Sequence, residues 1–486
     1  MKPLGLLGLT AALLPGLAAQ APALAAPAPS APLLRPQAVW PLPGGLDAEP
    51  MLNDNNPELI VAPGILFSSF DPARGFDGRP LAVSAAHLNA PQQGPFSLFS
   101  HHVFAGRKGS PDSTLWLAVV AAPRGSQPVR LRLRAGSTAL SQSVDGKQAA
   151  APFLPLPPLL AQGSTPIWSG PGSRVASELL RREPSPQLPE GWSLPPGQLT
   201  PLLVLPLPVR GLDPLLNGRN LQLRLDADGP VDVATLAGFG QGDAPPDPAL
   251  WGQLLAGGLS PKEHEPTPRG ASGPMIYSRV SGVQIGSVWR ARLTDPGAPT
   301  LSASRAPLSW PIASLERGSL GSGQVQTAEL SRAYPGTAWA AHGNYGVEYH
   351  LTIPLRNDSR APLALELALE SPLKQERLKG GLAFLPSPAR AVMFRGTVEV
   401  SGLDGPLPGG RPEGRQGFHL VLRNGQQGPV LGRVTLAPGE RRNVAVRLIY
   451  PADATPPQVL SLLPAGTIAA AEAAMKQSGA PPAARP

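Results

Sequence analysis

The chain contains no cysteine among its 486 residues. It therefore has no disulfide bonds, no thiolate metal site and no cysteine for lipid attachment. A protein without disulfides must obtain its stability from a buried apolar core. The missing cysteine thus excludes the disulfide-rich class of small secreted proteins and requires large folded domains.

Aromatic and charged residues are also scarce, whereas proline and glycine are abundant. Aromatic residues make up 5% of the chain and charged residues 15%, while 64 prolines and 54 glycines supply turn formers. So much proline disfavours a helical protein and predicts long irregular connections. The hydrophobic content of 42% still supports globular domains rather than a disordered chain.

Long hydrophobic runs are absent apart from a short one at the N-terminus. Residues 4–14 form an apolar segment behind the positive charge of Lys2, and Ala23-Leu24-Ala25 fits a small-residue cleavage site. The segment is too short to span a bilayer, and proline interrupts the later leucine-rich stretches. We therefore predict a signal peptide over residues 1–25, with the mature chain starting near Ala26. We expect export to the periplasm, cell envelope or extracellular space, without a transmembrane segment after cleavage.

Alternation of apolar and other residues is the main structural signal that is present. Leu351, Ile353 and Leu355 alternate before a polar turn, and the leucines of residues 363–369 alternate after it. Period-two patterning marks half-buried strands, so this segment predicts a β-hairpin. Similar strand–turn–strand patterns occupy residues 114–134, 203–233 and 434–449. The repeated order of parts predicts two related halves.

We predict an all-β fold with two immunoglobulin-like antiparallel β-sandwich domains and long Pro/Gly-rich loops. Two short helices are expected in addition, over residues 173–182 and 468–476. The predicted parts after the signal peptide are a disordered Ala/Pro-rich lead-in at 26–49, a first domain at 50–245, a linker at 246–274, a second domain at 275–465 and a C-terminal tail at 466–486.

Positive charge is concentrated late in the chain. The formal net charge is +8, and residues 371–450 hold 12 Lys or Arg against 5 Asp or Glu. A basic surface attracts anionic partners, which outside the cytoplasm would be polysaccharide, lipid head groups or acidic proteins rather than nucleic acid. The predicted anionic-partner face consists of Arg395, Arg433, Arg441 and Arg442. The alternative is that these arginines are the solvated faces of strands.

Histidines and carboxamides near the start raise the question of a metal site. His87, His101 and His102 are close in sequence to Asp71 and Asp77, and imidazole and carboxylate are ordinary zinc or copper ligands. Adjacent histidines on a strand point to opposite faces, so His87 and His101 are the candidate ligands and histidines packed in the fold are the alternative. The run at residues 53–56 offers oxygen ligands for calcium, or it forms a turn.

An aromatic cluster is the best candidate for binding a sugar. Tyr334, Trp339, Tyr345 and Tyr349 could stack on pyranose rings, although large aromatics on alternating strand positions are more often core residues. The sequence contains no Gly-x-Ser-x-Gly, His-Glu-x-x-His or phosphate-binding glycine-rich motif, which are common signatures of catalytic sites. The sequence therefore gives no catalytic residue and no cofactor to assign.

Several segments resemble a family of secreted cyanobacterial proteins known only as a domain of unknown function. The resemblance implies an exported protein of a photosynthetic bacterium and implies no activity, and the segments follow the family order over nearly the whole mature chain. They are residues 55–60, 84–89, 99–102, 345–347, 380–384, 394–398 and 450–457.

These patterns together favour an exported, non-catalytic protein of the periplasm or cell envelope that acts by binding or structural association. Its expected partner is an anionic envelope component or polysaccharide, and no oligomeric state is predicted. One alternative is a carbohydrate-binding or carbohydrate-active protein of envelope polysaccharide. Another alternative is a metal-binding periplasmic protein.

Overall fold

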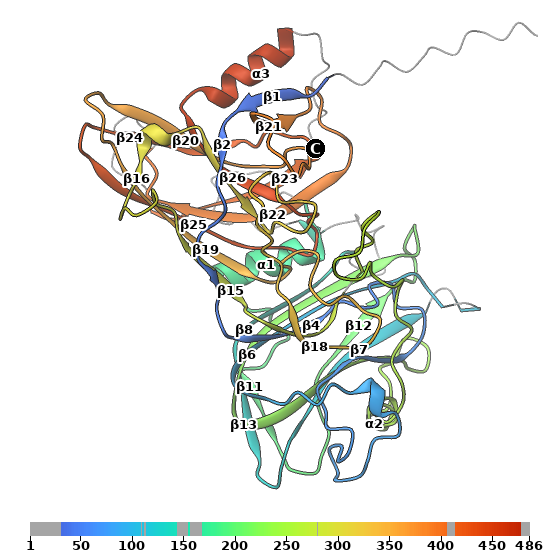
Figure 1. Cartoon of the computed structure of the whole chain (residues 1–486). Coiled ribbons are helices and arrows are strands. Elements are labelled where there is room, and N and C mark those ends of the chain that lie inside the picture. Colours follow the sequence, from blue (N-terminus) through green and yellow to red (C-terminus); the bar gives the residue numbers. More distant parts are fainter. Residues whose placement is uncertain are drawn as a thin grey trace, which may run out of the picture.

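The computed structural model describes residues 31–107, 109–110, 113–142, 154–155, 168–278, 280–405 and 414–477. The protein is built mostly of β-strands, as the alternation predicts, with a few short helices (Figure 1). The predicted signal peptide lies outside the described residues. Among the described residues, no helix has the length and apolar character that crossing a bilayer requires.

The largest sheet contains ten strands and lies in the lower part of Figure 1. Its main path runs in the order β11 (Gly191–Leu194), β8 (Val129–Leu140), β13 (Asn217–Phe239), β6 (Gln92–Phe104), β4 (Pro50–Asp54), β14 (Ser281–Ile285) and β18 (Leu330–Ala333). The strands β5 (Gly64–Ser68), β7 (Thr114–Pro123) and β12 (Thr200–Pro208) complete it.

The long strand β13 organises this sheet. Its first half, residues 217–227, pairs with β6 and β8, and its second half, residues 231–239, pairs with β7 and β5. Alternate side chains of β13, such as Leu223 and Val231, are buried in an apolar cluster that includes Phe96 and Leu131.

A seven-stranded and a five-stranded sheet share the largest core of the molecule. Leucines and valines from both sheets, including Leu351, Val446, Leu367 and Leu460, belong to a single buried cluster. The seven strands are β23 (Gln416–Arg423), β22 (Val392–Ser401), β25 (Arg441–Ile449), β19 (Glu348–Arg356), β15 (Val288–Arg292), β3 (Gly45–Leu46) and β16 (Leu301–Ser302). The five strands are β2 (Ala38–Val39), β17 (Leu308–Ile312), β26 (Gln458–Pro464), β20 (Leu363–Glu370) and β24 (Val430–Leu436).

Smaller elements complete the fold. Both predicted helices are confirmed within two residues: α1 spans Pro171–Arg181 and α3 spans Thr467–Gln477. The remaining elements are α2 (Pro248–Leu255), the 3-10 helices η1 (Ser84–Ala86) and η2 (Ala303–Arg305), the pair β1 (Leu33–Pro36) with β21 (Gly381–Phe384), and the pair β9 (Leu154–Pro155) with β10 (Trp168–Ser169).

The predicted hairpins are wrong, although their strands are present. Instead of pairing with each other, β7 and β8 follow one another along β13, both antiparallel to it. The segments 203–208 and 221–225 also belong to strands that pair elsewhere, since β12 pairs with β7. The turns after β19 and after β24 carry the chain between the seven- and five-stranded sheets. Period two identifies a strand and its buried face, but it does not identify the neighbouring strand.

The prediction that all strands pair antiparallel is wrong for four strand pairs. The three larger sheets are therefore mixed. The pairs β4–β6, β15–β19, β16–β19 and β2–β17 are parallel. Parallel neighbours require a connection that crosses over to the same end of the sheet, and alternation within one strand carries no signal of that connection.

Strand pairing also crosses the predicted domain boundaries. Residues 33–46 lie in the lead-in that was expected to be disordered, yet they form β1, β2 and β3. These strands pair with β21, β17 and β15 of the C-terminal half. Conversely, β14 and β18 join the ten-stranded sheet although both fall within 275–465. Pairing with distant strands satisfies the backbone polar groups of these segments.

Candidate functional site

The outward side of the seven-stranded sheet carries an unusual number of arginines. On β15, Trp289 and Ala291 are buried in the core while Arg290 and Arg292 point outward and are exposed. The same alternation directs Arg356 on β19 and Arg441 on β25 to the outward side. Leu355 precedes Arg356 and lies in the core, and on β25 the even-numbered Val444 and Val446 lie in the core, so the odd-numbered Arg441 faces outward.

Strand register gathers these four arginines. Arg290 is opposite His350 and Arg292 is opposite Thr352 on β19, while Arg356 is the direct cross-strand partner of Arg441. At about 3.3 Å per residue, the strip from the row of Arg290 to the row of Arg356 is roughly 20 Å long. We call Arg290, Arg292, Arg356 and Arg441 the arginine face.

The arginine face has little compensation from acidic groups. Among the described residues, none of its members forms an ion pair with a carboxylate; Arg292 instead donates to the carbonyl of Pro299 at 3.2 Å. Asp358 is a carboxylate that the charge of the arginine face affects. A hydrogen bond from Ser302 is the main cause that lowers the pKa of Asp358, and the charge of Arg356 lowers this pKa further. Four exposed guanidiniums without bound carboxylates form a surface suited to an anionic ligand.

A ladder of charged residues crosses the sheet at one end of this face. Arg447 on β25 donates to Glu399 at 3.2 Å and to Glu348 at 3.1 Å. Arg290 donates to Nδ1 of His350 at 2.8 Å, which leaves Nε2–H of His350 to donate to Glu348. Cross-strand register thus places Glu399, Arg447, His350 and Arg290 in one row.

Glu348 joins this ladder to the ten-stranded sheet. Its carboxylate accepts a hydrogen bond from Arg224 of β13 at 2.5 Å, and its side chain is 2% exposed. Burial alone would raise the pKa of Glu348, but the hydrogen bond from His350 and the charge of Arg224 hold it well below its ordinary value. Glu399 behaves differently: burial raises its pKa although the charge of Arg447 opposes the shift. Glu348 therefore stays ionised and holds the two sheets together.

A pocket of about 590 Å³ lies where the ladder meets the ten-stranded sheet. We call it the junction pocket. Its lining comes from β8, β13, β19, β25, the end of α1 and the loop before β11. The lining side chains divide into an apolar set, with Leu133, Leu179, Leu188, Pro184 and Pro189, and a charged set, with Arg134, Arg182, Arg224, Arg447, His350, Glu178, Glu183, Glu190 and Glu348.

Helix α1 forms one wall of the junction pocket and lies between the two large sheets (Figure 1). Pro171 occupies its first turn, where the missing N–H costs nothing, and Asp453 accepts a hydrogen bond from the backbone of Ser173 at 2.5 Å. Val175 and Leu179 lie one turn apart on a buried face that contacts Ile449 of β25. The helix ends at Arg181, and the next residue, Arg182, has a left-handed φ of 60° that turns the chain toward the pocket.

The four arginines predicted as an anionic-partner face do not form one surface. Arg441 belongs to the arginine face, but the side chain of Arg442 points to the opposite side of β25, where it pairs with Glu440 at 2.7 Å and also with Asp404. Arg395 is half-buried, roughly 33 Å along the sheet from Arg441 by register. Arg433 is exposed on the five-stranded sheet. The basic segment is real in sequence, but the fold spreads it over two sheets.

Three of the four aromatics proposed for sugar stacking are buried. Tyr345 and Tyr349 lie in the core of the two C-terminal sheets. Tyr334 is also buried, and its hydroxyl accepts a hydrogen bond from the backbone of Ser68 at 2.8 Å. Burial raises the pKa of Tyr334 and of Tyr349. The faces of these rings therefore pack against other protein side chains and are not open to a sugar. This confirms the alternative that aromatics on alternating strand positions are core residues.

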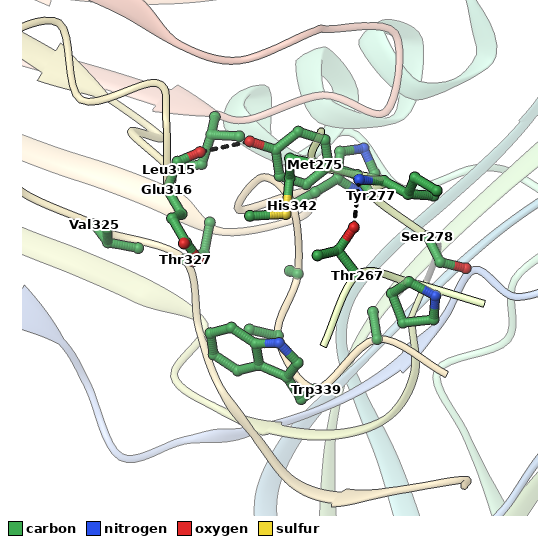
Figure 2. A pocket seen from close by; sticks show the side chains of 15 residues that line it. Thr267, Met275, Tyr277, Ser278, Leu315, Glu316, Val325, Thr327, Trp339 and His342 are labelled. Carbon is green, nitrogen blue, oxygen red and sulfur yellow. Dashed lines mark hydrogen bonds between the residues drawn. The ribbon is translucent and has the colours of Figure 1, made fainter. Parts of the chain in front are cut away.

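The fourth aromatic, Trp339, lines a small pocket with Tyr277 and His342 (Figure 2). Arg269 lies 4.5 Å from the centre of the Trp339 ring, and the Tyr277 hydroxyl donates to the carbonyl of Glu316. The pocket volume is about 50 Å³, whereas small-molecule sites hold about 300–1,000 Å³. This pocket is therefore too small for a sugar ring.

The histidines considered as metal ligands are buried: His87 directly follows η1, and His101 and His102 lie on β6. His87 bonds to Ser68 at 2.7 Å, and burial lowers its pKa to about 4. His101 lies 3.6 Å from Glu58. Burial alone would lower the pKa of His102, but the carboxylate of Asp54, 3.0 Å away, raises it. No group of three or more ligand side chains among the described residues could hold a metal ion.

The other acidic candidates serve the backbone or the core. Asp71 and Asp77 accept hydrogen bonds from backbone N–H groups two residues later, which is the turn-forming role of aspartate. Residues 53–56 were expected to form a turn or a calcium loop; instead they continue from β4 and are buried.

Sequence reasoning did not assign Arg290, Arg292 or Arg356 to a site, and it did not bring Glu348, His350 and Arg447 together. The alternation in residues 288–292 was a signal for the outward arginines. The grouping depends on parallel pairing of β15 with β19, which no local pattern reports.

Comparisons with known proteins give a family but no activity. The profile of a family described as protein of unknown function (DUF3370) matches residues 37–464. No curated protein matches the chain. One solved structure with some likeness is the crystal structure of Lac15 from a marine microbial metagenome, at 14% identity and a TM-score of 0.11. The alignment covers 88% of this chain and 65% of that one. So low a TM-score carries no argument about fold or function.

Proposed function

The chain belongs to the DUF3370 family, and we propose that it is an exported, non-catalytic protein of the cell envelope that binds an anionic polysaccharide. The arginine face is the observation that carries this proposal. Four exposed guanidiniums on three neighbouring strands present fork-shaped donors that match carboxylate or sulfate groups spaced along a chain.

The expected location supports a saccharide as the partner. An apolar segment behind Lys2 and the small residues before Ala26 have the parts of a signal peptide. Outside the cytoplasm, acidic polysaccharide is an abundant polyanion and nucleic acid is not. N-terminal sequencing of the secreted chain should begin at Ala26, and cell fractionation should recover it outside the inner membrane.

The scaffold under the arginine face supports binding without a large conformational change. The seven- and five-stranded sheets share a core, and we propose that they form the predicted β-sandwich. We further propose that this sandwich has an immunoglobulin-like strand arrangement, which experimental structure determination would test. A packed core on the inner side fixes the spacing of the outward arginines.

Binding to polygalacturonate, with neutral dextran as the comparison polymer, tests the proposal. The purified mature chain should bind polygalacturonate at low salt, not bind dextran, and lose affinity as sodium chloride screens the charges. The double variant Arg290→Glu with Arg441→Glu should weaken binding by about tenfold or more, since each reversal removes a charge-assisted contact.

The double variant Arg79→Glu with Arg130→Glu is the matched control, because it makes the same change in net charge. Arg79 is 87% exposed, Arg130 is also exposed, and both lie in the part of the chain that forms the ten-stranded sheet. This control should bind like the parent chain. Equal losses in the control and the arginine-face variant would show a nonspecific charge effect, and unchanged binding by the arginine-face variant would overturn the assignment of the face.

A further inference from the structure

The junction pocket offers more hydrogen-bond donors than acceptors. Each arginine carries five N–H donors. Among the bonds of the described residues, Arg224 uses one donor, toward Glu348, and the Arg182 side chain uses none. The acceptors are largely engaged, because Glu348 accepts from Arg224, Arg447 and His350. A ligand that fills this pocket must therefore be rich in acceptor oxygens.

The acidic side chains of the pocket are mostly paired away from its space. Glu178 pairs with Arg174 at 2.9 Å and Glu183 pairs with Arg181 at 2.5 Å, and neither arginine lines the pocket. Glu190 makes no ion pair among the described residues. The rim thus holds the guanidinium of Arg182 and the carboxylate of Glu190 as its available charged groups.

Part of the pocket lining is apolar. Leu133, Leu179 and Leu188 lie among the lining residues. A sugar ring combines a C–H face, which such a wall can cover, with a rim of hydroxyls that both donate and accept hydrogen bonds. The pocket volume of about 590 Å³ falls in the range of small-molecule sites.

We propose that the junction pocket binds one acidic sugar unit, with its carboxylate on Arg182 and Arg224 and a hydroxyl donating to Glu190. The choice of ligand rests on the proposed function, because the unit would belong to the polymer held by the arginine face. His350 connects the two places, since it lines the pocket and also accepts a hydrogen bond from Arg290. The pocket adds recognition of one sugar unit to the general attraction of the face.

Arg182 is the residue to change, because its substitution need not disturb the fold. It is exposed and has a left-handed φ of 60°, a conformation that asparagine tolerates well at a helix end. Arg182→Asn therefore removes the guanidinium while keeping the helix terminus. Arg182→Lys keeps the charge and loses the two-pronged contact with a carboxylate.

Calorimetry with galacturonic acid trisaccharide tests the pocket, and a neutral galactose trisaccharide serves as the comparison ligand. The parent chain should bind the acidic trisaccharide at least tenfold more tightly than the neutral one. Arg182→Asn should lose about tenfold in affinity for the acidic ligand, and Arg182→Lys should lose less. Equal binding of the two trisaccharides, or an unchanged affinity in Arg182→Asn, would overturn the proposal.

The pocket and the arginine face can fail separately. The double variant Arg356→Glu with Arg441→Glu changes the end of the face away from His350. It should lose polymer binding and keep trisaccharide binding, whereas Arg182→Asn should lose trisaccharide binding and keep polymer binding. Polymer binding without any trisaccharide binding would overturn the pocket and leave the face. Trisaccharide binding without polymer binding would overturn the face and leave the pocket as an isolated site.

Discussion

At the scale of single residues, Glu348 is where the charges of the two large sheets meet. Removing one member of a buried ion pair leaves its partners without compensation, which costs more than losing an exposed pair. The sequence shows this glutamate at the start of an alternating segment, but it does not show Arg224, Arg447 and His350 around it.

Glu348→Gln should lower the free energy of unfolding by roughly 3 kcal/mol at pH 7. Because the folded state depresses the pKa of Glu348, its contribution is present above about pH 4.3, the ordinary value of glutamate, and is lost as pH falls below it. Urea denaturation should therefore give free energies of unfolding for the parent chain and the variant that converge at acid pH.

Glu329→Gln is the control, because Glu329 is 59% exposed and pairs with an exposed arginine. The effect of this substitution on the free energy of unfolding should stay under about 1 kcal/mol. An equal effect of the two substitutions at pH 7 would contradict the role of Glu348.

At the scale of elements, α1 shows how a correctly predicted helix can have an unpredicted position. Its apolar spacing is a local feature, so its place along the chain could be read from the sequence within two residues. Its N-terminus is capped by the distant Asp453, which the sequence did not indicate. Its place between two sheets depends on Gly172, where an added Cβ would lie 2.6 Å from the Cβ of Ala452. The strands show the same contrast between a correct element and an incorrect position. Alternation correctly predicted β19 and β20, but the prediction that these two strands pair with each other was wrong.

Gly172→Ala should destabilise the protein although alanine favours helices. The contact with Ala452 forces the helix to shift, at a cost of about 1–3 kcal/mol that exceeds the gain in helix propensity of about 1 kcal/mol. Gly252→Ala in α2 is the matched control, because an added Cβ there meets nothing within 4 Å. The melting temperature should fall in the first variant and stay the same or rise in the second. A rise in both would show that α1 is not tightly packed.

At the scale of the whole molecule, the chain ends and the central segment tie the sheets together. The strands of residues 33–46 pair with the C-terminal half, and β14 and β18 pair within the ten-stranded sheet. Glu348 and α1 add contacts across the same junction. A cut between residues 245 and 275 therefore separates strands from their partners on both sides.

A fragment of residues 275–465 should fold poorly, because it lacks the strands at residues 33–46 and leaves β14 and β18 without their sheet. The mature chain should unfold in one cooperative thermal transition when followed by circular dichroism. Two well-separated transitions in the mature chain, or a fragment with a sharp transition near the same temperature, would contradict this coupling.

The sequence by itself determined the β-rich class, the two helices near residues 173 and 468, and the core positions of Leu351, Ile353 and Leu355. These features depend on the side-chain period and on turn and cap residues, which act over a few positions. Only the tertiary structure decided which strands are neighbours, that Arg290 and Arg356 share a surface, and that Arg224, Arg447 and His350 surround Glu348. Pairing joins residues distant in sequence through backbone groups that every residue carries, so no local pattern encodes the partner.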